Sequence, residues 1–257
     1  MPYTETQPSL YFQCTGSGTA IIFISPPAMG HLTFRYQQLL KDHFKVITFD
    51  NRGDCRSSNK DETLQFSDFV NDVKRILDAN DISQAIICGY SNGGLLAQEF
   101  ALQYPNHTLA LILIGGYHSP ANSTLRLEYK IGISIAKWQW ISLLAKALSF
   151  NHFRDKKAAK DMELEIKKTN PHSLTQQYQL GLHYQATDRL HHIHCPLLLI
   201  YGANDFYVHS YRHGFQEKIG DTEVAYIHHS KHQVPTKYYN ECNAIIYEWS
   251  KRKKWIK

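Results

Sequence analysis

Short hydrophobic runs alternate along the chain with segments in which apolar residues recur at helical spacing. The continuous runs predict strands at residues 19–24, 44–49, 85–89, 109–114, 196–201 and 223–227. Helical spacing predicts helices near residues 34–42, 66–79, 92–101, 211–219 and 236–251. Because the strand runs are continuously apolar, we expect a mostly parallel, doubly wound α/β sheet with helices on both faces.

The N-terminal part shows a different pattern. Residues 3–24 predict two short strands joined by Gly16-Ser17-Gly18, a sequence typical of a β-hairpin turn. This glycine pair is too short for a dinucleotide-binding loop.

The alternation breaks between residues 118 and 187, which contain no strand-like run. One apolar stripe there comprises Ile131, Ile135, Trp138, Ser142, Ala145 and Leu148. We therefore expect a helical cap at 118–187, inserted into a core formed by 1–117 and 188–257. The simpler interpretation of Trp138 and Trp140 is that they pack the insert onto the sheet domain, and the functional one is a lid whose apolar underside lines a substrate pocket.

Composition is that of a globular protein, with 43% hydrophobic and 20% charged residues. No apolar run is long enough to span a bilayer, and the first six residues lack the pattern of a secretory signal. The five scattered cysteines form no Cys-x-x-Cys pair. These features favour reduced thiols and a cytoplasmic location.

The formal charge of +5 is concentrated in two regions, residues 126–168 and 251–257. Neither contains a recognised nucleic-acid-binding motif or an aromatic stacking pattern, so we interpret them as solvated helix ends and expect no nucleic-acid partner.

The sequence Gly89-Tyr90-Ser91-Asn92-Gly93 joins a predicted strand to a predicted helix. A serine held at such a turn lies at a helix N-terminus, where N–H groups and the helix dipole favour developing negative charge. Ser91 is therefore a candidate nucleophile. The structural alternative is an ordinary helix N-cap in a pentapeptide that occurs by chance.

A serine nucleophile needs a base and a group that orients the base. Asp205 and His232 follow two later strands, and carboxyl ends of strands form the binding crevice of open α/β sheets. Asp205 has the alternative of a helix N-cap, and His228 and His229 compete with His232. The cluster at residues 191–195 lacks a zinc-ligand spacing, so we expect no metal and no cofactor.

These motifs together resemble those of the α/β-hydrolase superfamily, in its single-domain form with a helical cap, over nearly the whole chain. Residues 89–93 are similar to its nucleophile elbow, residues 50–57 to its Asp-x-Arg-Gly-x-Gly-x-Ser loop, and residues 201–205 to its acid-bearing loop. The resemblance implies that Ser91 attacks, that His232 serves as base and then acid, and that Asp205 fixes the imidazole tautomer.

The oxyanion loop departs from the family pattern. Ser25-Pro26-Pro27 stands where His-Gly is usual, and proline has no N–H to donate. We expect the backbone N–H of Asn92 to supply one donor and that of Ala28 or Met29 to supply the second.

The resulting hypothesis is a serine hydrolase that cleaves an ester, thioester or lactone of a small molecule through an acyl-enzyme on Ser91. The alternative is a weakly active or non-catalytic receptor or signalling partner with this fold, which the unusual Pro26-Pro27 loop favours. The sequence contains no signal for the oligomeric state or for substrate identity.

Overall fold

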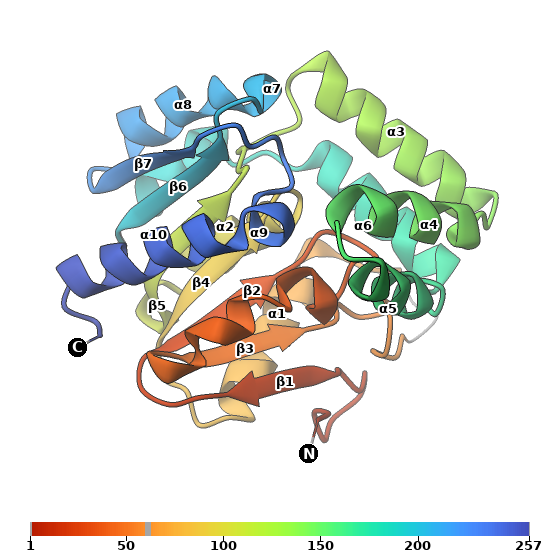
Figure 1. Ribbon diagram of the computed structural model, residues 1–257, viewed down its shortest axis with the longest axis horizontal. Coiled ribbons are helices and arrows are strands. Elements are labelled where there is room, and N and C mark those ends of the chain that lie inside the picture. The colour runs from red at the N-terminus through yellow and green to blue at the C-terminus, as the bar shows by residue number, and fades with distance from the viewer. Residues whose placement is uncertain (1, 60–62, 257) are drawn as a thin grey trace.

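Seven strands form one sheet in the computed structural model, which describes residues 2–59 and 63–256 (Figure 1). The order across the sheet is β1-β3-β2-β4-β5-β6-β7. Their bounds are β1 Phe12–Thr15, β2 Ala20–Ile24, β3 Lys45–Phe49, β4 Ala85–Tyr90, β5 Thr108–Ile114, β6 Leu197–Gly202 and β7 Thr222–Ile227. Only β1 runs antiparallel to its neighbour within this sheet, so the predicted mostly parallel sheet is confirmed.

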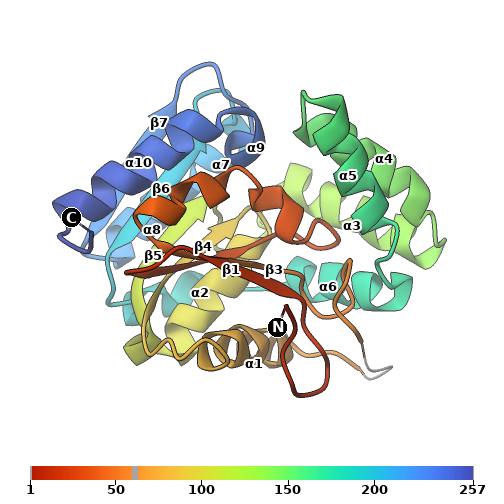
Figure 2. The same cartoon turned by 60° about the horizontal axis from the view of Figure 1, so that its bottom comes forward.

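Helices cover both faces of the sheet, as Figure 2 shows. Helices α1 (Phe66–Asp78), α2 (Gly93–Gln103) and α8 (Tyr211–Lys218) share a core with Ile22 and Ile24. On the other face α10 (Tyr239–Arg252) shares a second core with Ile21 and Phe23. Successive residues of β2 thus point into opposite cores, which explains the unbroken apolar run in the sequence.

Several short helical turns complete this core. They are the 3₁₀ helices η1 (His31–Phe34), η2 (Gln37–Asp42), η3 (Pro105–His107) and η4 (Thr187–His192), with α7 (Phe206–His209) and α9 (Val234–Lys237). The helix expected near residues 34–42 is therefore 3₁₀ rather than α.

The predicted N-terminal hairpin is wrong. Strand β1 pairs with β3 in the register Phe12↔Phe49, and β3 separates β1 from β2. The segment Gly16-Ser17-Gly18 therefore crosses the end of β3. A turn motif predicts that the chain reverses direction, but it does not predict which strand will pair with the strand after the turn.

Four helices lie between β5 and β6 in the sequence: α3 (Ser123–Lys137), α4 (Ile141–His152), α5 (Lys156–Ile166) and α6 (Pro171–His183). They group at one side of the sheet (Figures 1 and 2). The two ends of this insertion meet, since the N–H of Ala186 donates to the carbonyl oxygen of His118 at 3.0 Å.

The tryptophans of this insertion do not pack it onto the sheet domain. Trp138 is 69% exposed and Trp140 is 54% exposed, so that interpretation is wrong. The helical conformation is interrupted at Gln139, which has a φ of 57°. The apolar stripe expected on a single helix is therefore divided between α3 and α4. Contact with the other helices comes instead from residues such as Tyr178 of α6, which packs against Gly132 of α3.

None of the helices among the described residues is both long enough and apolar enough to cross a lipid bilayer.

Candidate active site

Ser91 occupies a sharp turn between β4 and α2, as the Gly-x-Ser-x-Gly spacing predicts. Its φ of 51° is in the left-handed region, which non-glycine residues rarely adopt. The Ser91 N–H donates to the carbonyl oxygen of Ile114 at 2.8 Å, which anchors the turn to β5. A Cβ on Gly93 would lie 2.3 Å from the carbonyl oxygen of Ile24, so only glycine allows α2 to start this close to β2.

The structure brings Ser91, His232 and Asp205 together. His232 Nε2 lies 2.7 Å from Ser91 Oγ, and His232 Nδ1 lies 2.6 Å from Asp205 Oδ2. Asp205 is 2% exposed and follows β6, whereas His232 lies in the loop after β7. The competing histidines, His228 and His229, lie at the exposed surface with their rings tilted against each other, 3.9 Å between centroids.

Gly115 makes room for the imidazole. It ends β5 with a φ of 59°, and a Cβ at this position would lie 2.8 Å from Cε1 of His232. Tyr90 lies on another side of the ring, with its centroid 5.3 Å from that of His232. The histidine is therefore confined by backbone on one side and by a buried aromatic ring on another.

A cavity of about 300 Å³ opens above Ser91. Its wall combines Ser91, Asn92 and His232 with apolar residues of the inserted helices: Ile131, Ile135, Leu144 and Leu148. These include three members of the stripe found in the sequence, which supports the lid interpretation of the insertion.

Sequence reasoning missed several polar side chains of this cavity. Glu128, Ile131 and Ile135 lie on one face of α3, at i, i+3 and i+7, so the helical spacing in the sequence contained the signal. Desolvation, with a smaller contribution from the charge of Asp205, raises the pKa of Glu128. His152 lies within hydrogen-bond distance of the Tyr90 hydroxyl, at 3.2 Å, and burial lowers its pKa to about 4.

The oxyanion loop differs from the expected arrangement. The N–H of Ala28 donates to Asp54 Oδ2 at 2.9 Å, and the N–H of Met29 donates to the carbonyl oxygen of Pro26 at 3.2 Å. Neither group is directed at Ser91 in this structure. The N–H of Asn92 has no protein acceptor among the described residues. Pro27 and Met29 both line the cavity beside Asn92.

Asp54 connects this loop to the inserted helices. Its Oδ1 accepts a hydrogen bond from Gln177 Nε2 of α6 at 2.9 Å. The next residue, Cys55, has a φ of 47° and places its thiol 3.3 Å from the carbonyl oxygen of Ala28. Burial raises the pKa of Asp54 to about 7. The signal in the sequence was Cys55, which stands where the usual loop pattern has glycine.

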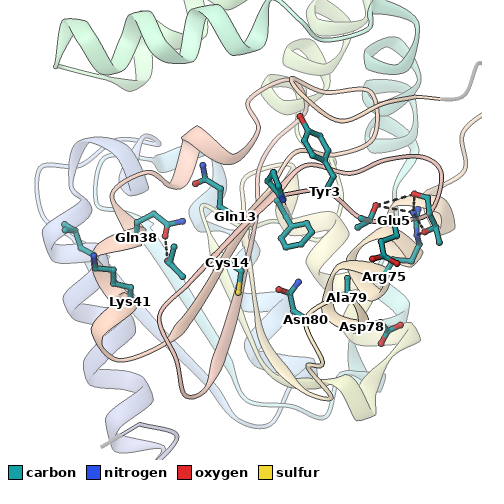
Figure 3. A pocket seen from close by; sticks show the side chains of 16 residues that line it. Tyr3, Glu5, Gln13, Cys14, Gln38, Lys41, Arg75, Asp78, Ala79 and Asn80 are labelled. Atoms are coloured by element: carbon teal, nitrogen blue, oxygen red, sulfur yellow. Dashed lines mark hydrogen bonds between the residues drawn. The ribbon is translucent and has the colours of Figure 1, made fainter.

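A larger hollow, about 1240 Å³, lies elsewhere, between the N-terminal segment, β1 and the end of α1 (Figure 3). Arg75 is one of its charged lining residues, and its guanidinium bonds to Thr6, Pro8 and Asp72. No member of the Ser91–His232–Asp205 set lines this hollow, so we do not place chemistry there.

A metal centre finds no support in the geometry. Across residues 2–59 and 63–256, no three His, Cys, Asp or Glu side chains are grouped so that they could hold a metal ion.

Comparison with known proteins agrees with this geometry. The model of the family described as serine aminopeptidase, S33 matches residues 29–236. The putative carbamate hydrolase RutD of Azorhizobium caulinodans is 28% identical over 133 residues, which cover 51% of this chain and 50% of that protein. The AB hydrolase superfamily protein YisY of Bacillus subtilis is 28% identical over 132 residues, 51% of this chain and 49% of that protein. The chain thus matches about half the length of these curated relatives.

Solved structures show the same fold over nearly the whole chain. An esterase from Exiguobacterium antarcticum superposes with a TM-score of 0.84 at 16% identity, covering 97% of this chain and 98% of that one. An enol-lactonase from Burkholderia xenovorans superposes with a TM-score of 0.81 at 16% identity, covering 96% and 98%. Since the family model spans well over half of the residues, the chain belongs to the serine aminopeptidase S33 family of α/β hydrolases.

Proposed function

We propose that this α/β hydrolase cleaves a carboxylic ester, thioester or lactone of a small molecule through an acyl-enzyme on Ser91. The observation that carries the proposal is the continuous hydrogen-bonded chain from Ser91 Oγ through His232 to Asp205, with contacts of 2.7 and 2.6 Å. Nucleophile, base and orienting acid are thus within proton-transfer distance without rearrangement.

In the proposed reaction His232 Nε2 accepts the proton of Ser91 as Oγ bonds to the substrate carbonyl carbon. The protonated imidazole then donates this proton to the departing alcohol, thiol or ring oxygen, which leaves an acyl group on Ser91. Water, deprotonated by the same nitrogen, releases the acid and regenerates the serine. Asp205 keeps the Nδ1 proton of His232 in place throughout, and the N–H of Asn92 at the start of α2 stabilises the oxyanion.

The cavity wall supports an apolar acyl group on the substrate. Ile135, Leu144 and Leu148 face the same space as the Ser91 hydroxyl, and the volume of about 300 Å³ suits a small molecule.

The test is hydrolysis of p-nitrophenyl butyrate. Replacing Ser91 with alanine should lower kcat by more than about a thousandfold, whereas Ser142→Ala, at an exposed serine of α4, should leave kcat unchanged. Turnover by S91A at the wild-type rate would refute the assignment.

A second candidate is cleavage of a substrate that carries an amino group, and Glu128 is the observation that favours it. Its carboxylate lines the cavity of Ser91 and forms no ion pair with a described residue. An aminoacyl p-nitrophenyl ester tests this candidate. Glu128→Gln should then raise KM for the aminoacyl ester and leave hydrolysis of the neutral butyrate ester unaffected.

The alternative of a ligand receptor rests on the oxyanion loop, because the N–H groups of Ala28 and Met29 are both bonded within the protein. A fluorophosphonate probe separates the two possibilities. Labelling at Ser91 supports the enzyme, and folded protein that resists the probe supports the receptor.

A further inference from the structure

The inserted helices expose an unusual amount of apolar surface. Among the described residues, eleven large apolar side chains are exposed, and seven of them belong to α3, α4, α5 and the turn between α3 and α4. These seven are Leu127, Ile131, Trp138, Trp140, Leu143, Phe150 and Leu164. A patch of this kind marks an interaction surface more often than it marks ordinary surface variation.

Helical spacing places these side chains in two stripes. On α3, Leu127, Ile131 and Trp138 follow one another at i, i+4 and i+11, and on α4 Leu143 and Phe150 are seven residues apart. The indole rings of Trp138 and Trp140 lie 5.7 Å apart and join the stripes at the turn. Both helices lie at the side of the molecule farthest from β7 and α10 (Figures 1 and 2).

Uncompensated positive charge accompanies this surface. Arg126, Lys130, Lys137 and Lys146 are exposed and form no ion pair with a described residue. The single acid of α3 and α4 is Glu128, which lines the cavity.

Helix α5 differs from α3 and α4, because it contains several acidic side chains and one of its lysines, Lys160, is paired. Glu163 contacts both Lys160 and Lys167, and Asp161 contacts Arg35. Lys156 and Lys157, in the first turn of α5, are also exposed and form no ion pair with a described residue, so the uncompensated positive charge continues along the chain from α3 and α4 to the start of α5.

On this evidence we propose that the outer face of α3 and α4 docks the protein on an anionic lipid bilayer. Tryptophan and phenylalanine side chains enter the headgroup region, and neighbouring lysines meet lipid phosphate and carboxylate groups. Charge repulsion disfavours a dimer formed through this face. A two-fold contact between two copies of the protein would bring the four unpaired cations of one copy against those of the other.

The cavity opens at the edge of this surface. Ile131 is 49% exposed and also lines the wall above Ser91, so the docked face and the cavity mouth share a residue. Docking would place the mouth at the lipid boundary, where an ester with an apolar tail resides. This last step rests on the proposed function, whereas the docking itself does not.

Cosedimentation of the full chain with vesicles tests the proposal. Vesicles of phosphatidylcholine in which about a third of the lipid is phosphatidylserine should bind the protein at least about tenfold more tightly than phosphatidylcholine alone, and added salt should weaken the binding. The double variant Lys130→Gln/Lys146→Gln should bind about twentyfold more weakly, at about fivefold per lysine. Trp138→Ser/Phe150→Ser should lose about tenfold or more.

Matched controls alter the same residue types outside the insertion. Leu39→Ser/Phe206→Ser removes two exposed apolar side chains, and Lys251→Gln/Lys254→Gln removes two exposed lysines that form no ion pair with a described residue. Both controls should bind like the wild type. All four variants should hydrolyse p-nitrophenyl butyrate normally, because none of these positions lines the cavity.

Three results would overturn the proposal: no binding to either vesicle, equal losses in insertion variants and controls, or a doubled molar mass without vesicles that the insertion variants abolish. The last result would assign this face to self-association. Ser91→Ala should bind vesicles like the wild type, so failure of the hydrolase assignment and failure of docking are distinguishable.

Discussion

The carboxylate of Asp54 accepts a hydrogen bond from the backbone N–H of Ala28 at 2.9 Å. The same carboxylate accepts one from Gln177 on α6. A single buried acid therefore fixes both the loop beside Ser91 and an inserted helix. An N–H that donates to Asp54 is not free to donate elsewhere, so in the proposed reaction this contact limits which backbone donors could stabilise the oxyanion.

Asp54 should give the protein a distinctive dependence of stability on pH. Its pKa is about 7 in the folded protein and about 4 in an unfolded chain. Between these values the folded state holds more protons, so this group makes the free energy of unfolding fall as pH rises from about 4 to 7. Asp54→Asn replaces the titrating carboxyl with an amide, whose oxygen is still an acceptor for the Ala28 N–H. The stability of this variant relative to the wild type should therefore increase as the pH rises from about 4 to 7. Urea unfolding at several pH values measures the difference, and parallel curves would contradict it.

Pro27 should limit turnover. It lines the cavity beside Ser91 and has no N–H, and one missing oxyanion donor typically costs about a hundred- to a thousandfold. Pro27→Ala restores an N–H at this position and should raise kcat for p-nitrophenyl butyrate about tenfold or more, with KM little changed. Pro105→Ala, in η3, is the control. A fall in kcat for P27A would instead show that the rigidity of the loop matters more than the donor.

Asp205→Asn should reduce kcat by about a thousandfold to ten-thousandfold, because an amide at 2.6 Å from Nδ1 of His232 favours the wrong imidazole tautomer. Steady-state kinetics with the butyrate ester measure the loss. Asp188→Asn, at a carboxylate that is fully exposed, should have no effect. Retained activity in D205N would remove Asp205 from the proposed mechanism.

Gly93→Ala should destabilise the protein. The added Cβ would lie 2.3 Å from the Ile24 carbonyl oxygen, which is backbone and cannot rotate away, so α2 must shift from β2 at a cost of about 1–3 kcal/mol. Urea unfolding measures the change. Gly220→Ala is the control, because nothing lies within 4 Å of a Cβ there. Equal stability of both variants would show that the turn tolerates a side chain.

The parts that the sequence predicted depend on local signals. The central strands of the parallel sheet, such as β2 and β5, are largely continuous apolar runs, and the turn at Ser91 is specified by neighbouring glycines, so both follow from a few consecutive residues. The convergence of Asp205 and His232 followed from their positions after strands whose carboxyl ends share one edge. The register of β1, by contrast, depends on pairing with β3, about 35 residues away along the chain.

The missed features depend on contacts between distant segments. Nothing near Ala28 indicates that its N–H is bonded to Asp54, and nothing near Asp54 indicates Gln177. Trp138 was expected to pack the insertion onto the sheet domain, but it is 69% exposed. Large apolar side chains are frequent on protein surfaces, so hydrophobicity alone does not show which single residue is buried. Glu128 shares the helical stripe of Ile131, so its position was present in the sequence pattern, although a charged residue on a helix face is typical of a solvent-exposed surface.

The bond between Ala186 and His118 closes the inserted segment at its base, next to strands that are already neighbours in the sheet. The conformational entropy lost when the ends of an inserted segment are brought together grows only slowly with its length. Lengthening or shortening α3–α6 should therefore change this cost little. Ser91 precedes the insertion and Asp205 and His232 follow it, so substitutions in α3–α6 can change the cavity wall while the three residues that we propose react with the substrate stay where they are. Under the proposed function, substrate preference and catalysis are thereby free to evolve on separate stretches of the gene.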